Sequence, residues 1–109
     1  METPEFLSAT RKLLDGVELA ALVDYLAYNP TAGDVIQGSG GVRKLRWRLD
    51  GRGKRGGARV IYFYHDAGVP VFLLTAYAKN ERADLSDAER NAYRRLTKLL
   101  VTSYGRAMP

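Results

Sequence analysis

The sequence contains no cysteine and only one histidine, His65, in 109 residues. The missing thiols exclude disulfides, thiolate-bound metals and cysteine nucleophiles. A single histidine cannot build a multi-histidine metal site, and the acidic residues are scattered without H-E-x-x-H spacing. We therefore expect no metal and no cofactor. We expect His65, at the end of a predicted strand, to be structural or exposed to solvent.

Long apolar runs are also absent. No stretch approaches the length of about 18 residues that a membrane-spanning helix needs, and the start "METPEF" lacks the basic and then apolar build of a signal peptide. These features predict a cytoplasmic protein without membrane contact. The length and a hydrophobic content of 46% predict a single domain, residues 1–109, with one core and no deep cofactor cavity.

Positive charge is unevenly distributed along the chain. The net charge is +5, and eight of the 17 Lys and Arg residues lie between positions 43 and 59, where Asp50 is the one acid. Such a basic segment on a near-neutral body is typical of a protein that binds a polyanion. The eight cations are Arg43, Lys44, Arg46, Arg48, Arg52, Lys54, Arg55 and Arg59.

Within the basic segment, residues 51–56 read "GRGKRG" and match the G-x-G-x-x-G spacing of dinucleotide-binding domains. That fingerprint requires a helix after the loop, whereas residues 58–65, "ARVIYFYH", predict a strand. A P-loop fails as well, because Lys54 is followed by Arg55 and not by a magnesium-binding Ser or Thr. We interpret this stretch as a flexible hairpin loop whose glycines allow close approach while Arg52, Lys54 and Arg55 bind phosphates.

Two helices are predicted at the start of the chain. Thr3 and Pro4 mark the beginning of the first helix. Asp15 and Glu18 have capping-box spacing at the beginning of the second, which ends before Pro30. At most four residues connect the two helices, which predicts an antiparallel helical hairpin.

Three strands and a last helix follow a glycine-rich loop over residues 30–41, in which Val35-Ile36 should anchor the loop to the core. Strands are predicted at 42–49, 58–65 and 71–79. The first strand alternates between apolar Leu45, Trp47 and Leu49 and basic Lys44, Arg46 and Arg48. A capping box from Ser86 to Glu89 begins the last helix, with a predicted core stripe of Ala92, Leu96, Leu99, Leu100 and Ser103. This order predicts an α+β domain with an antiparallel sheet.

Strand pairing would bring Lys44 and Arg46 close to Arg59, and Lys79 ends the third strand. A cation cluster of this kind stabilises the doubly charged state through which a phosphodiester is cleaved. Crowded like charges lower the pKa of a lysine, which could then take the proton of a ribose 2′-hydroxyl while a second cation assists the leaving oxygen. We hypothesise a metal-free ribonuclease without histidine. The pattern alone does not separate this from an exposed sheet face on which Lys44, Arg46 and Arg48 are merely solvated.

Other hydrolases are less well supported. A Ser-His-Asp triad would need His65 as its base, yet no serine lies on a nucleophile elbow. A glycosidase-type pair of carboxylates stays open on sequence grounds, although a basic groove is an unfavourable place for it.

Three blocks of the sequence, "GDVIQGSGGVRKLRW", "GRGKRGGARVIYFYHD" and "FLLTAYAKNERADLS", resemble the RelE/ParE superfamily of bacterial type II toxins, and within it the HigB host-inhibition branch. The resemblance implies a helical hairpin on a small twisted antiparallel sheet of three to four strands, closed by a C-terminal helix. It implies cleavage of mRNA in the A site of the translating ribosome. It also implies a cognate antitoxin, which in the HigB branch usually carries a helix-turn-helix domain.

The resemblance also implies roles for individual residues. The catalytic positions of relatives correspond to Lys44, Arg46, Arg59 and Lys79, and Arg59 takes the place of the arginine on the scissile phosphate. The remaining basic residues are then expected to bind RNA or the ribosome: Arg43, Arg48, Arg52, Lys54 and Arg55.

The chain departs from the family pattern at two positions. Asn80 stands where well-studied relatives have an arginine, and Ser86 stands where they have a tyrosine. Candidates to compensate are Glu81, Tyr93 and Tyr104. Relatives also have a short strand before the first helix, which we expect to be reduced or trimmed in this chain.

Two alternatives to a ribosome-dependent mRNA endonuclease therefore stay open. Toxins of the ParE branch share the fold and inhibit DNA gyrase by binding it. The departures at Asn80 and Ser86 would suit a binding module of weakened activity. A shared face for Lys44, Arg46 and Arg59 would favour the nuclease.

Overall fold

The computed structural model describes residues 1–49 and 57–107. Its elements are α1 (Pro4–Thr10), α2 (Gly16–Tyr28), β1 (Asp34–Val35), β2 (Val42–Trp47), β3 (Ala58–Phe63), β4 (Phe72–Ala78) and α3 (Asp87–Ala107). The strands form one sheet in the order β1-β2-β3-β4, and every neighbouring pair is antiparallel. The predicted α+β fold, with two N-terminal helices, an antiparallel sheet and a C-terminal helix, is confirmed.

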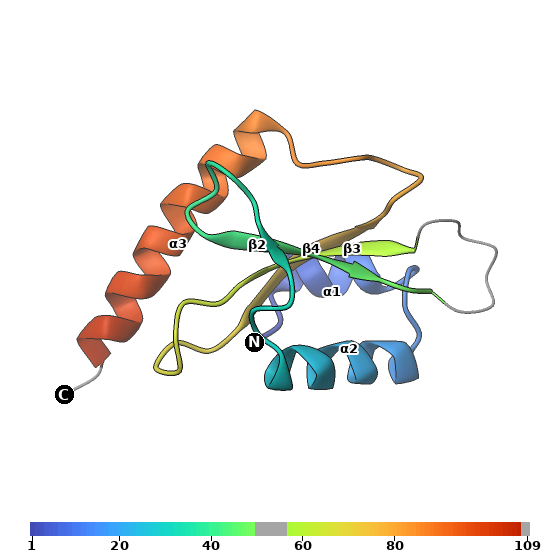
Figure 1. Cartoon of the computed structure of the whole chain (residues 1–109), viewed down its shortest axis with the longest axis horizontal. Coiled ribbons are helices and arrows are strands. Elements are labelled where there is room, and N and C mark those ends of the chain that lie inside the picture. The colour runs from blue at the N-terminus through green and yellow to red at the C-terminus, as the bar shows by residue number, and fades with distance from the viewer. Residues whose placement is uncertain (50–56, 108–109) are drawn as a thin grey trace.

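The sheet has a helical layer on each side (Figure 1). Side chains alternate along β3, so Val60 and Tyr62 point toward α1 and α2, on what we call the hairpin face. Ile61 and Phe63 point toward α3, on what we call the α3 face. All six residues of β3, Arg59 included, are buried because this central strand is covered on both sides.

All three predicted helix starts are confirmed. The Thr3 side chain caps α1, and Asp15 and Glu18 form a reciprocal capping box at α2. At α3, the Ser86 backbone N–H donates to Glu89 and the Glu89 N–H donates to the Ser86 hydroxyl, at 2.8 and 3.1 Å. These bonds satisfy backbone donors that the first helical turn leaves without partners, so each helix begins at a defined residue.

The predicted core stripe of α3 is wrong for three of its five residues. Leu96 and Leu100 pack against the sheet, but Leu99 is 65% exposed, and Ala92 and Ser103 are exposed too. The side chains that pack against the α3 face are Tyr93, Leu96, Leu100, Val101 and Tyr104. The tyrosines widen the buried stripe and rotate it, because each buries its ring while its hydroxyl stays near the surface. None of the helices in the described ranges is long and apolar enough to cross a membrane.

Both edges of the sheet carry short additions. Residues 34–35 form the edge strand β1, in the stretch predicted to be a loop, and Ile36 next to it is buried as expected. Val35 does not anchor the loop, because it is 57% exposed on this edge. At the other edge, Glu2 forms a single parallel bridge with Leu73, so the edge strand of relatives is reduced to one residue pair.

A buried tyrosine fixes the loop after α2 to the sheet. The Tyr62 hydroxyl donates to the Pro30 carbonyl at 2.9 Å and accepts from the Gly33 N–H at 2.8 Å. Burial raises the pKa of Tyr62, so the hydroxyl keeps its proton and can make both bonds. Tyr77, on the α3 face, contrasts with it: its hydroxyl is buried without a hydrogen-bond partner in the described part of the chain.

We expect the substitution Tyr62→Phe to lower the free energy of unfolding by about 1–3 kcal/mol, because it leaves a buried donor and a carbonyl without their partner. The matched substitution Tyr77→Phe should be neutral or stabilising, since it removes a buried hydroxyl that makes no such bond. Urea denaturation of both variants measures the difference. Equal destabilisation by the two substitutions would contradict this account of the loop.

Candidate functional site

Basic side chains of two neighbouring strands meet on the α3 face. Arg46 of β2 lies directly opposite Arg59 of β3, and Arg59 lies opposite Tyr77 of β4. Lys44 is two residues before Arg46 on the same strand, so alternation places it on the same face. The structure therefore brings Lys44, Arg46 and Arg59 to one side of the sheet.

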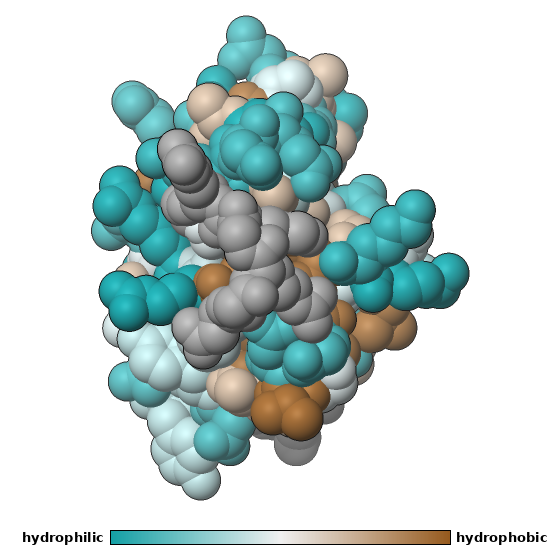
Figure 2. Space-filling model, turned by 90° about the vertical axis from the view of Figure 1, so that its right-hand side faces the viewer, coloured by the Kyte–Doolittle hydropathy of each residue, from teal (hydrophilic) through white to brown (hydrophobic). Residues whose placement is uncertain are grey.

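A hollow of about 490 Å³ opens where β2 and β3 lead into their connection. The described residues that line it are Arg46, Trp47, Arg48, Leu49, Gly57, Arg59 and Lys79. Four of these residues are cations and none is acidic, so the lining that the structure describes favours an anion. Figure 2 views the molecule from this end and shows many hydrophilic residues on it.

The cations of the hollow differ in their burial. Arg59 is only 7% exposed, and its guanidinium donates to the Ala58 carbonyl at 3.3 Å. Arg46, Arg48 and Lys79 are exposed. We infer that Arg59 forms the floor of the hollow and that the other three form its rim. A guanidinium held by the core is oriented before a ligand arrives, which favours recognition of a charged transition state.

Gly57 closes the hollow at its base, and the sequence reasoning missed it. Its φ is +66°, and a Cβ atom at this position would lie 2.4 Å from the Trp47 carbonyl oxygen. Its own carbonyl accepts the Lys79 N–H at 3.0 Å. Gly57 therefore lets β2 approach β3 closely and ties Lys79 to the rim. The sequence signal was a glycine pair directly before a strand, which was interpreted only as loop flexibility.

Lys44 shares the α3 face but contacts an acid that the sequence reasoning did not single out. Its Nζ lies 3.5 Å from Oδ1 of Asp84. Partial burial alone would raise the pKa of Asp84, but the Leu85 N–H and the charges of Lys44 and Arg90 outweigh it, so the pKa is lowered. Asp84 is therefore a carboxylate at neutral pH.

The comparison with protein families agrees with this geometry. Residues 11–108 match the family model of the RelE toxin of the RelE/RelB toxin-antitoxin system. The chain belongs to the RelE toxin family. It is a toxin of a toxin-antitoxin system, with a cognate antitoxin as its partner, in a family whose members are generally ribonucleases.

Not every cation assigned to RNA binding in this RelE-family toxin lies near the hollow. The Arg43 guanidinium donates to the carbonyls of Thr31 and Gly33, at 3.3 and 2.8 Å, and so holds the loop after α2. Strand alternation places it on the hairpin face, away from Arg46. The other predicted contacts, Arg52, Lys54 and Arg55, lie outside the described residues, as does the "GRGKRG" motif.

Tyr77 and Arg82 extend the basic row beyond Arg59. The Arg82 guanidinium carbon lies 4.7 Å from the centroid of the Tyr77 ring, and its NH2 group donates to Glu89 at 2.7 Å. Burial and then Asp84 raise the pKa of Tyr77, which therefore stays protonated at neutral pH. These contacts orient a cation that is carried by the segment between β4 and α3.

The residues proposed to compensate for Asn80 and Ser86 lie elsewhere. The Tyr93 hydroxyl donates to Glu5 at 3.0 Å, and the Tyr104 ring packs edge-on against Phe72. Both tyrosines thus attach α3 to the body of the toxin. Ser86 itself is used as the cap of α3.

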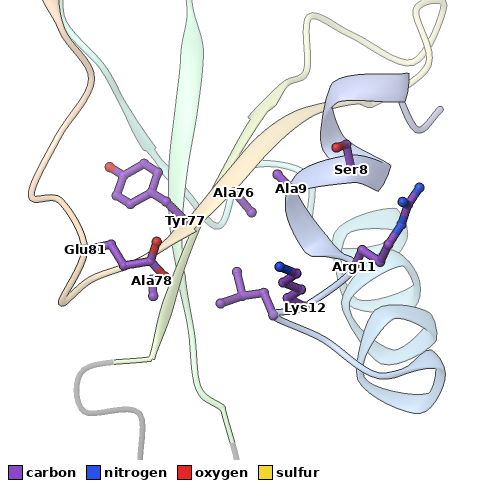
Figure 3. A pocket seen from close by; sticks show the side chains of 9 residues that line it. Ser8, Ala9, Arg11, Lys12, Ala76, Tyr77, Ala78 and Glu81 are labelled. Atoms are coloured by element: carbon purple, nitrogen blue, oxygen red, sulfur yellow. The ribbon is translucent and has the colours of Figure 1, made fainter.

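Glu81 lines a second hollow, of about 430 Å³, between α1 and the end of β4 (Figure 3). Its walls include Ala9, Ala76 and Ala78, and its charged residues are of both signs. Figure 3 shows Tyr77 pointing to the other side of the strand. This hollow is apolar and of mixed charge, so it suits a phosphate less well than the hollow around Arg59.

Among the residues that the structure describes, no three His, Asp or Glu side chains are grouped so that they could hold a metal ion. His65 is exposed, as expected, and its ring stacks on Phe63 with 6.4 Å between centroids.

We expect Gly57→Ala to destabilise the protein by at least about 1–3 kcal/mol, because alanine at positive φ is strained and its Cβ would collide with backbone. Gly16→Ala is the matched control: no atom lies within 4 Å of its added Cβ, and alanine favours the helix there. Thermal unfolding compares the two variants. A melting temperature of Gly57→Ala that equals that of Gly16→Ala would refute the close approach of the strands.

Proposed function

We propose that this toxin is a metal-independent endoribonuclease that cleaves mRNA on the translating ribosome. The observation that carries the proposal is the hollow in which Arg46, Arg48, Arg59 and Lys79 converge. Cleavage of a phosphodiester passes through a five-coordinate state with two negative charges, and fixed cations around that state lower its free energy. The match to a family of ribonucleases supports the same reaction.

The residues of the hollow divide the chemistry between them. Arginine stays protonated at physiological pH, so Arg59 and Arg46 act as charge and hydrogen-bond donors to the phosphate. Lys79 is the one lysine among the described residues that line the hollow, and its amine is the candidate base for the proton of the ribose 2′-hydroxyl. The 2′-oxygen then bonds to phosphorus while the bond to the 5′-oxygen breaks. The products are a 2′,3′-cyclic phosphate and a 5′-hydroxyl, whose proton comes from solvent.

The ribosome supplies what the hollow lacks. The cations of this hollow would bind phosphates of the RNA. Such contacts position an RNA strand without selecting its sequence. In-line attack also requires the 2′-hydroxyl, phosphorus and leaving oxygen to be aligned, which a mobile RNA strand rarely achieves. A substrate already ordered in the ribosomal A site removes this entropic cost.

We also assign the toxin to the HigB-like branch, supported by the three sequence blocks that resemble it. The antitoxin would then carry a helix-turn-helix domain, and both proteins would act in the cytoplasm, where ribosomes are. An acidic antitoxin segment would be complementary in charge to the α3 face.

We expect Arg59→Ala to reduce mRNA cleavage by about 10²–10³-fold, the loss typical of a preorganised donor to a charged transition state. Lys98→Ala removes the same charge from an exposed position on α3 and should leave cleavage unchanged. The assay is translation of a reporter with purified toxin, with primer extension to locate the cuts, and thermal unfolding shows that both variants are folded. Equal cleavage by Arg59→Ala and wild type would remove Arg59 from the mechanism. If the wild-type toxin inhibits DNA gyrase and makes no cuts in mRNA, it is a ParE-like toxin. If the wild-type toxin shows neither activity, it is a binding module.

We expect an mRNA with a 2′-deoxynucleotide at the scissile position to resist cleavage, because the attacking oxygen is missing. The same replacement one nucleotide downstream should have little effect. Analysis of the ends of the products provides a second measurement, since attack by the 2′-oxygen leaves a cyclic phosphate and a 5′-hydroxyl. Efficient cleavage of the deoxy substrate would show that water is the nucleophile.

A further inference from the structure

Lys44 is on the same face as Arg46 and Arg59, yet it is not among the residues that line the hollow. Its ammonium group lies 3.5 Å from Oδ1 of Asp84. Lys44 is therefore a cation of the predicted site whose nearest charged partner in the free protein is a carboxylate. An RNA phosphate that binds Lys44 must compete with this carboxylate.

Asp84 is held in place independently of Lys44. It lies in the segment between β4 and α3, which crosses above the sheet (Figure 1). Its Oδ1 accepts from the Leu85 N–H at 2.8 Å, and its Oδ2 accepts from Arg90 at 3.2 Å. Arg90 is itself oriented by Asp87, at 2.9 Å. The carboxylate is thus fixed by α3 and its first turn, and Lys44 is the partner that can leave.

The pair is also accessible. The Lys44 side chain is 29% exposed and that of Asp84 is 45% exposed. A pair so exposed is weak, because water and salt screen it and two side chains must be ordered to form it. A phosphate can therefore take the place of the carboxylate without unfolding any part of the protein.

We propose that Asp84 is a built-in competitor of RNA for Lys44, so that Lys44 joins the anion site only when a correctly placed phosphate displaces the carboxylate. Asp84 is then a specificity-determining residue. It weakens the binding of free RNA, whose phosphates are not positioned, and it affects a phosphate presented directly at Lys44 much less. The inference rests on the proposed function in taking RNA as the polyanion.

The test measures how the affinity for a fluorescent single-stranded RNA oligonucleotide depends on salt. Each cation that engages a single-stranded phosphate contributes about 0.7 to the slope of log K against log salt. Asp84→Asn keeps the size of the side chain and its bond from Leu85 but frees Lys44. We expect the slope for Asp84→Asn to be steeper than that of the wild type by about 0.7. Between 1 M and 0.1 M salt, the affinity of the variant should therefore rise roughly five-fold more than that of the wild type.

Asp87→Asn is the matched control, because Asp87 also contacts Arg90 and the substitution removes the same charge. It leaves the contact between Lys44 and Asp84 intact, so its slope should equal that of the wild type. A gain shared equally by Asp84→Asn and Asp87→Asn would reduce the effect to net charge and overturn the proposal.

Lys44→Gln keeps the test decisive even if Asp84→Asn folds poorly. In the Asp84→Asn background, Lys44→Gln should make the salt dependence shallower by about 0.7. With Asp84 present, Lys44→Gln should change the salt dependence clearly less. A full loss of 0.7 with Asp84 present would show that Lys44 already engages free RNA, and the proposal would be wrong. Because binding is measured, a toxin that shows this coupling but never cuts mRNA would refute the proposed function and leave the competition intact.

Discussion

The candidate site depends on a charge arrangement that is unfavourable in itself: two arginines directly opposite each other on neighbouring strands. Like charges at such positions repel, and one of the two, Arg59, is buried in the central strand. An apolar side chain at position 59 would be more stable. This chain has such a side chain two residues later, at the fully buried Ile61. The other residues of β3 are buried on both faces of the sheet, and their burial stabilises the strand that carries Arg59. What the arrangement provides is a preorganised positive field at one end of the sheet.

Several elements far apart in the sequence cooperate to shape that field. Gly57 allows β2 and β3 to meet and binds the backbone of Lys79, so the ends of three strands converge. The segment between β4 and α3 then brings Arg82 over Tyr77 and Asp84 to Lys44. Both contacts are tied to the first turn of α3, through Glu89 and Arg90. The first turn of α3 therefore orients charges beside the sheet face against which the later turns of the same helix pack.

Sequence patterns predicted local structure well where the physical signal was local. The capping residues Thr3, Asp15 and Ser86 and the two faces of β2 are all found as expected. The predicted stripe on α3 left out Tyr93 and Tyr104, whose large rings pack against the sheet, and included Leu99, which is exposed. The glycine pair before β3 did not reveal the close approach that Gly57 allows, and no pattern singled out Asp84. Each depends on one contact with a residue many positions away, with Trp47 for Gly57 and with Lys44 for Asp84.

The sequence by itself determined where the three helices and the three longer strands begin, which face of β2 is apolar, and that the excess positive charge is concentrated in one strand and its neighbourhood. These properties follow from side-chain periodicity and capping, which act over a few residues. Only the tertiary structure decided that Arg46 lies opposite Arg59, that Arg43 holds the loop after α2, and that Lys44 is held by an acid. Strand register and the path of a connecting segment are set by packing across the whole sheet, so no local pattern contains them.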